Sequence, residues 1–76
     1  MIDKDLYKII SESLNIKIEK IDEKTDMQNT KEWDSLNHVK IIIALSKKFN
    51  IKIQTSDYDK LVSIKSIKIF LKKKNI

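Results

Sequence analysis

Cysteine, glycine and proline are absent from this chain, and each absence removes a class of structure or chemistry. There is no cysteine, which excludes disulfides, a thiolate nucleophile and cysteine metal ligands, so any thiol would have to arrive on a cofactor. There is no glycine, which excludes the glycine-rich loops that cradle phosphates. Without glycine or proline, tight hairpins are also disfavoured. We therefore expect helices whose connections place Asn, Asp and Ser at special backbone positions.

Long apolar runs and clustered histidines are missing as well. No stretch approaches the roughly 20 apolar residues of a membrane span, and the start, Met1-Ile2-Asp3-Lys4-Asp5, lacks the basic-then-apolar order of a signal peptide. The single histidine, His38, excludes a multi-histidine metal site, and no metal is expected. The missing membrane span and signal-peptide pattern lead us to expect a soluble, cytoplasmic protein. Its length of 76 residues predicts that residues 1–76 form one small domain.

Charge is distributed unevenly along the chain. Residues 1–35 hold six lysines and nine carboxylates, residues 36–76 hold ten lysines and two carboxylates, and the net charge is +5. Such asymmetry is found in proteins that bind nucleic acid or anionic membranes. Arginine, the usual residue for bidentate recognition of phosphate and guanine, is absent. We interpret the lysines mainly as residues of solvated helix faces. The alternative function is that of a small basic helical module that binds nucleic acid or anionic surfaces.

Hydrophobic periodicity predicts an all-α fold. Apolar residues recur at helical spacing over residues 3–14 and 64–74, and over a second helix that starts at Ser35 or Leu36 and runs to about residue 49. The run from residue 15 to residue 34 has little to bury, so we expect a long ordered loop there; loops of this length in a small domain are usually functional or disordered. The prediction is a small four-helix bundle with a long first loop and a short third helix over residues 57–61.

The helix ends and the core can be predicted residue by residue. Asn15 and Asn50 follow two of the helices and can take the left-handed conformation that ends a helix. Ser63 can cap the last helix, and Ser56 or Asp57 the short one. Four side chains are expected to pin the long loop, namely Ile16, Ile18, Ile21 and Met27. The expected core comes from the inner faces of the long helices: Leu6, Ile10, Val39, Ile43, Phe49, Ile64, Ile67 and Phe70.

One serine stands where the polar loop meets the second helix. It lies in the run Glu32-Trp33-Asp34-Ser35-Leu36-Asn37-His38. Asp34 or Ser35 at this position can cap the helix, which is one of the commonest roles of these residues. The same three residues, Asp34-Ser35-Leu36, also match the signature of the acyl carrier protein family, which this chain resembles. In that family the serine of the signature carries 4′-phosphopantetheine.

The resemblance extends over residues 3–73, almost the whole chain. Residues 15–35 are similar to the family's first loop, and residues 61–67 resemble the entry to its last helix. The segment Phe49-Asn50-Ile51 resembles the phenylalanine–glycine–isoleucine close of the second helix, with Asn50 in place of glycine. Trp33 before the signature and His38 after it resemble stand-alone carriers outside central fatty-acid synthesis.

The resemblance implies a carrier and not an enzyme. The protein would hold an acyl or aminoacyl group as a thioester on 4′-phosphopantetheine attached to Ser35, in fatty-acid or specialised acyl metabolism. Its implied partners are a phosphopantetheinyl transferase, a loading ligase and downstream acyl-transfer enzymes, which would meet a monomeric carrier. Asp34 would help the transferase position its metal and substrate. Leu36 would either offer partners a hydrophobic contact or form the rim of the core.

Two further side chains near Ser35 are candidates for partner contacts. Trp33 is expected to form a hydrophobic staple with the second helix or to meet a partner. His38 is expected to be solvated or to face a partner. A catalytic triad of Asp34, Ser35 and His38 is disfavoured, because three groups so close to one helix start are poorly placed for a triad with an oxyanion hole.

The second helix departs from the family in its charge. The family's helix is rich in glutamate, which partner enzymes contact with basic patches, but here it carries Lys40, Lys47 and Lys48. We therefore predict partners with acidic or neutral docking surfaces. A cleft between the second, third and fourth helices would either shelter an acyl chain or be ordinary packed core. Its expected lining is Ile43, Leu45, Phe49, Ile53, Tyr58, Leu61 and Ile67.

Overall fold

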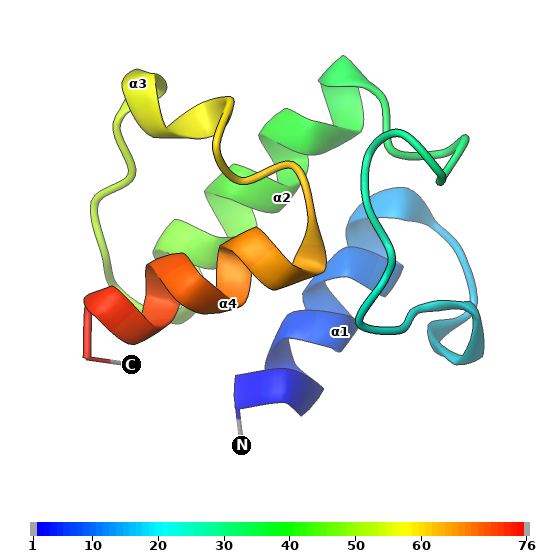
Figure 1. Ribbon diagram of the computed structural model, residues 1–76, viewed down its shortest axis with the longest axis horizontal. Helices are drawn as coiled ribbons and strands as arrows, with labels where there is room; N and C mark the ends of the chain where they lie inside the picture. The colour runs from blue at the N-terminus through cyan, green and yellow to red at the C-terminus, as the bar shows by residue number, and fades with distance from the viewer. Residues whose placement is uncertain (1, 76) are drawn as a thin grey trace.

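The computed structural model describes residues 2–75 and is built from helices (Figure 1). They follow one another as α1 (Ile2–Leu14), α2 (Ser35–Lys48), α3 (Thr55–Tyr58) and α4 (Ile64–Lys73), with one 3₁₀ turn, η1 (Ile18–Lys20), in the first loop. The described residues form no β-strand, only an isolated bridge between Asp26 and Ser63. The predicted all-α four-helix bundle is confirmed. None of the described helices is both long and apolar enough to cross a membrane.

Asparagine closes the helices in the absence of glycine. Asn15 and Asn50 adopt φ values of 56° and 51°, in the left-handed region. Directly after them, the Ile16 N–H donates to the Ser11 carbonyl and the Ile51 N–H to the Ser46 carbonyl, each at 3.1 Å. These six-to-one hydrogen bonds define the Schellman motif. Both predicted stop signals are therefore confirmed.

The start of α4 is also as predicted, but α3 is displaced. Ser63 caps α4, its hydroxyl accepting from the Ser66 N–H at 3.0 Å. The sequence predicted a helix over residues 57–61 with Ser56 or Asp57 as the cap, whereas α3 begins at Thr55 and ends at Tyr58. The Gln54 N–H donates to the Asp57 carboxylate at 3.3 Å. Asp57 thus stabilises the first turn from inside α3, so it does not precede the helix as a cap.

The core lies between the three longer helices and includes part of the first loop. Four of the predicted core residues, Leu6, Ile10, Ile64 and Ile67, are fully buried, and Phe49 and Phe70 are partly buried. Trp33 and Ile21 add side chains from the loop. The remaining buried apolar residues are Ile9, Leu14, Ile41, Ile42, Leu45, Leu61 and Leu71.

The predicted inner face of α2 was wrong for two residues. Val39 is 41% exposed and Ile43 is 46% exposed. The face that packs on the core is instead formed by His38, Ile41, Ile42 and Leu45. α2 carries aliphatic residues on both sides, so its hydrophobic pattern does not determine which side is buried. The histidine occupies a core position that the pattern assigned to solvent.

The first loop is ordered by its own polar contacts and by a link to the start of α4. Asp26 and Asn29 bond to each other's backbone N–H groups at 2.8 and 3.0 Å. The Met27 N–H donates to the Val62 carbonyl at 2.9 Å, and the Ile64 N–H donates to the Thr25 carbonyl at 3.0 Å. Of the predicted pins, Ile21 is buried, Ile16 and Met27 are partly buried, and Ile18 is exposed, so Ile18 was predicted wrongly.

Candidate functional site

Ser35 is the first residue of α2, and its side chain is exposed. Asp34 is the N-cap: its carboxylate accepts from the Asn37 N–H at 2.9 Å, and its carbonyl accepts from the His38 N–H at 2.8 Å. Of the two candidate caps, Asp34 and Ser35, the structure uses Asp34. The Ser35 hydroxyl therefore takes no part in the capping hydrogen bonds. The first N–H groups of a helix have no intrahelical acceptor. Those of Ser35 and Leu36 thus lie beside an exposed hydroxyl.

The chain before Ser35 is held by two hydrogen bonds and by the burial of one side chain. The Trp33 N–H donates to the Thr30 carbonyl at 3.0 Å. The Asn37 amide donates to the Glu32 carbonyl at 2.8 Å, which ties the first turn of α2 back to the loop. The indole of Trp33 is 1% exposed. Ser35 therefore projects from a hydrogen-bonded corner between the loop and α2.

Trp33 and His38 form a buried polar contact beneath this corner. The Trp33 Nε1–H donates to His38 Nδ1 at 3.0 Å, and the ring centroids lie 6.1 Å apart. Trp33 precedes the cap and His38 is the fourth helical residue, so the pair occupies the two positions of the predicted hydrophobic staple. The contact itself is a hydrogen bond to a histidine and not an apolar one. His38 is only 7% exposed. The expectation of a solvated or partner-facing His38 was wrong, and the buried Trp33 side chain does not face partners either.

The second nitrogen of His38 reaches α3. His38 Nε2 lies 2.9 Å from the Tyr58 carbonyl oxygen. Both ring nitrogens are thus engaged by groups other than Ser35, and the Asp34 carboxylate caps the helix. This geometry contradicts a catalytic triad of these three residues. In the part of the chain that the structure describes, no cluster of His, Cys, Asp or Glu residues is arranged to hold a metal ion.

An apolar stripe runs along the outer side of α2 from the residue next to Ser35. Leu36 is 70% exposed, and Val39 and Ile43 continue the stripe at helical spacing. Lys40 and Lys47 are exposed, as is Lys48. Lys40 and Lys47 lie seven positions apart and so share a face of the helix. The sequence pattern predicted a partner surface at Leu36 and the lysines. Val39 and Ile43 belong to the exposed side as well, but their helical spacing had indicated core positions.

The residues of the predicted acyl cleft differ in their environments. Leu45, Leu61 and Ile67 are fully buried members of the core. Phe49, Ile53 and Tyr58 are partly buried and pack against that core, whereas Ile43 lies on the exposed stripe. Six of the seven side chains therefore belong to one packed cluster, and Ile43 does not.

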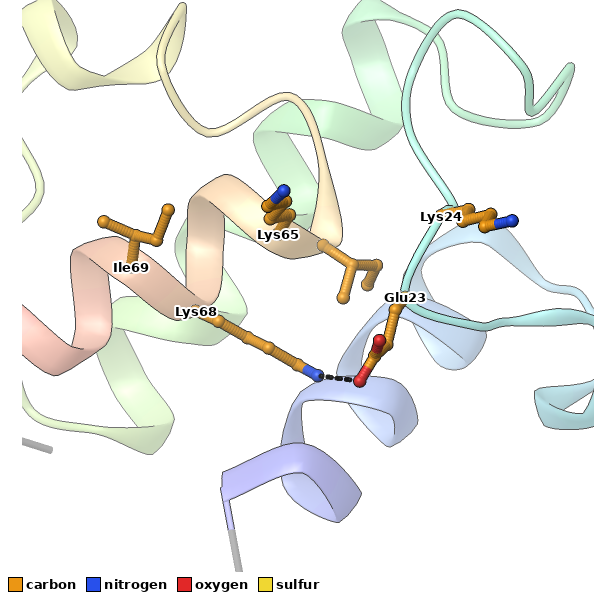
Figure 2. A pocket seen from close by; sticks show the side chains of 6 residues that line it. Glu23, Lys24, Lys65, Lys68 and Ile69 are labelled. Carbon is orange, nitrogen blue, oxygen red and sulfur yellow. Dashed lines mark ion pairs between the residues drawn. The ribbon is translucent and has the colours of Figure 1, made fainter.

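A shallow hollow of about 410 Å³ lies between the first loop and α4, lined by residues of neither α2 nor the Ser35 corner. In Figure 2, Lys68 extends from α4 toward Glu23. Its ammonium nitrogen lies 3.4 Å from Asp3, 3.8 Å from Glu23 and 5.3 Å from the Tyr7 ring centre. Burial opposes the charge of Lys68, but Tyr7, Asp3 and Glu23 outweigh burial and raise the pKa of Lys68 above its ordinary value. This cluster joins α4 to α1 and to the loop.

Comparison with known proteins gives a consistent family of relatives. A sequence profile described as "Phosphopantetheine attachment site" matches residues 4–71, a span that includes the Ser35 corner. The acyl carrier protein of Buchnera aphidicola subsp. Schizaphis graminum is 35% identical over 74 residues, which cover 97% of this chain and 94% of that protein. The acyl carrier protein of Wolinella succinogenes is 30% identical over 60 residues, 79% of each chain.

Proposed function

Because the chain belongs to the acyl carrier protein family, we propose that Ser35 is the residue that bears its phosphopantetheine arm. The protein is a carrier, and 4′-phosphopantetheine is its covalent cofactor. The observation that supports Ser35 is its exposed hydroxyl at the first position of α2, directly after the Asp34 cap. When attached, the arm supplies the thiol that a chain without cysteine lacks, and an acyl group is held there as a thioester.

The residues around Ser35 fit a phosphodiester. The N-terminus of a helix presents free N–H groups and the positive end of the helix dipole, both of which favour an anion. The N–H groups of Ser35 and Leu36 are the first two of α2. Asp34 is occupied as the cap and keeps this turn in shape. We propose that it also helps a transferase position its metal and substrate.

Partner enzymes are proposed to dock on the outer side of α2. The exposed stripe of Leu36, Val39 and Ile43 offers apolar contact area beside the arm, and Lys40, Lys47 and Lys48 give this surface positive charge. Complementary charge mainly raises the rate of association. The cognate transferase and the loading enzyme should therefore present an acidic or neutral surface with an apolar centre.

The cargo is proposed to be an acyl or aminoacyl group, and the packed cluster of Leu45, Phe49, Ile53, Tyr58, Leu61 and Ile67 is the proposed shelter for its chain. The partly buried members at the edge of this cluster, among them Tyr58, are the proposed entry. The carrier presents its cargo to other enzymes and does not act as a catalyst itself. The comparisons with known proteins give no support to the alternative of a nucleic-acid-binding module.

The test of Ser35 uses coenzyme A and a broad-specificity phosphopantetheinyl transferase that modifies the wild-type chain. The intact mass of wild type should rise by one phosphopantetheinyl group, and Ser35→Ala should stay unmodified. Ser56→Ala is the matched control, because Ser56 is another exposed serine in the first turn of a helix. Equal modification of Ser35→Ala and wild type would reject Ser35 as the attachment site.

A further inference from the structure

His38 connects the segment before Ser35 with α3 through its two ring nitrogens. It accepts from the Trp33 indole, two residues before Ser35, and contacts the Tyr58 carbonyl at the C-terminal end of α3. α3 is only four residues long and none of its side chains is fully buried, although Tyr58 packs partly against the core. Its position therefore depends strongly on the few contacts at its end, including the one to His38.

The hydrogen bonds fix which nitrogen of His38 carries the proton. An indole Nε1–H can only donate, so His38 Nδ1 must accept and has no proton. The ring proton then lies on Nε2, from which it is donated to the Tyr58 carbonyl. The same carbonyl accepts from the Leu61 N–H at 3.2 Å. A carbonyl oxygen has two lone pairs, so both bonds are satisfied.

We propose that His38 is a positioning residue for attachment at Ser35, and that its two nitrogens have separable tasks. Nδ1 holds the Trp33 indole and thereby the angle at which the Asp34-Ser35 corner leaves the loop. Nε2 holds the end of α3 beside α2. One imidazole thus holds the corner at Ser35 through Nδ1 and the neighbouring short helix through Nε2. The proposal rests on the proposed role of Ser35.

The contrasting explanation is that His38 only fills space in the core. An apolar side chain of similar size would then serve equally well, because a buried hydrogen-bonded network is not always more stable than apolar packing. The location of the network argues for more than packing. Its donor belongs to Trp33 in the loop and its acceptor to Tyr58 in α3, so the network links two segments that are far apart in the sequence.

Two conservative variants separate the tasks. His38→Asn places an amide oxygen near the position of Nδ1, where it can accept from Trp33, but it does not extend to Tyr58. His38→Gln places an amide N–H near the position of Nε2, where it can donate to the Tyr58 carbonyl, but it leaves the indole without its acceptor. Trp33→Phe removes the indole donor and leaves His38 in place.

Two readouts are measured on each folded variant, with the free energy of unfolding as the control. The first is kcat/KM for arm transfer from coenzyme A by the transferase that modifies wild type. We expect His38→Asn to stay near wild type, and His38→Gln and Trp33→Phe to fall by up to about 100-fold, the scale of a misplaced reacting group. The second is hydrogen exchange of the Leu61 amide, which should quicken in His38→Asn and stay slow in the other two.

The crossed pattern decides the proposal. If His38→Asn and His38→Gln change both readouts together, in proportion to their loss of stability, His38 is a packing residue and the proposal is overturned. Unchanged transfer to Trp33→Phe would overturn it as well. Imidazole ¹⁵N shifts of wild type must also show the proton on Nε2. If Ser35→Ala is still modified, the proposed function fails, whereas the ¹⁵N shifts and the Leu61 exchange still test the two hydrogen bonds of His38.

Discussion

Helices α2 and α4 are both amphipathic, but they distribute their apolar residues differently. α4 buries Ile64, Ile67 and Leu71, and Ile69 is its one exposed aliphatic residue. α2 buries Ile41, Ile42 and Leu45 and still exposes three others along its outer side. A helix that only fills a core needs one apolar face. The surplus on α2 starts beside Ser35, which supports a docking role for α2 and a structural role for α4.

The buried side of α2 shows the converse exchange. One of the buried residues of α2 is the polar His38, whereas the buried residues of α4 are all isoleucine or leucine. Polar groups are costly to bury unless they are hydrogen-bonded, and both nitrogens of His38 are bonded. α2 thus departs from the simple amphipathic pattern on both sides, and departures of this kind are expected at functional sites.

The largest expected effect separates the two apolar sides of α2. Ile41→Ala should lower the free energy of unfolding by about 2–5 kcal/mol, because Ile41 is fully buried and its truncation leaves a cavity. Ile43→Ala should cost less than about 1 kcal/mol, as is usual for surface sites. Urea unfolding followed by circular dichroism measures both, with Ile67→Ala on α4 as a second buried position. Equal losses at positions 41 and 43 would contradict the assignment of faces.

The second expected effect compares the lysines of the two helices. The triple variant Lys40→Glu, Lys47→Glu, Lys48→Glu should slow loading by the cognate enzyme about tenfold at low salt, because it removes electrostatic steering. The difference from wild type should shrink at high salt. Lys65→Glu, Lys72→Glu, Lys73→Glu on α4 changes the net charge equally and is the matched control. If the two triple variants slow loading alike, only net charge matters and α2 has no special docking role.

The third effect concerns the caps that begin the two helices. Asp34→Ala and Ser63→Ala should each destabilise the protein by about 1 kcal/mol, because each leaves a helix N–H group without its acceptor. Thermal unfolding measures both. Only Asp34→Ala should also slow arm transfer, since only its cap adjoins Ser35. An equal change in transfer for the two variants would show that the cap acts through stability alone.

The smallest effect is expected at the ion pairs of α4. Lys68→Met should cost at most about 1 kcal/mol, and less at high salt, because its partners Asp3 and Glu23 are exposed. The pKa of Lys68 is raised above its ordinary value of 10.5. The contribution of charged Lys68 to the free energy of unfolding is therefore complete below pH 10.5 and is lost as the pH rises through the raised pKa. Lys65→Met is the control, since the described residues offer Lys65 no ion-pair partner. A larger loss for Lys65→Met would contradict the role of Lys68.

The sequence predicted helix positions better than helix orientation. Asn15, Asn50 and Ser63 are local signals, and each ends or begins a helix as expected. Which side of α2 faces the core depends on what the other elements leave open, and Val39 and Ile43 were therefore misplaced. α3 began earlier than predicted because Asp57 stabilises its first turn from within.

At the candidate site, the corner of Asp34 and Ser35 was foreseen, but the link from His38 to α3 was not. Its acceptor is a backbone carbonyl, twenty residues further along the chain. Every residue except the last supplies such a carbonyl, so nothing in the residue types indicates which one His38 meets. The cue that was available is the neighbouring Trp33, a residue whose indole requires an acceptor when it is buried.

The asparagine-closed helix ends bear on how the chain reaches its fold. Because asparagine ends the helices and the chain contains no proline, there is no prolyl bond whose isomerisation would delay refolding by tens of seconds. The absence of glycine also narrows the range of backbone conformations open to the unfolded chain, so less entropy is lost on folding. After dilution from denaturant, we therefore expect the chain to refold without a proline-limited slow phase.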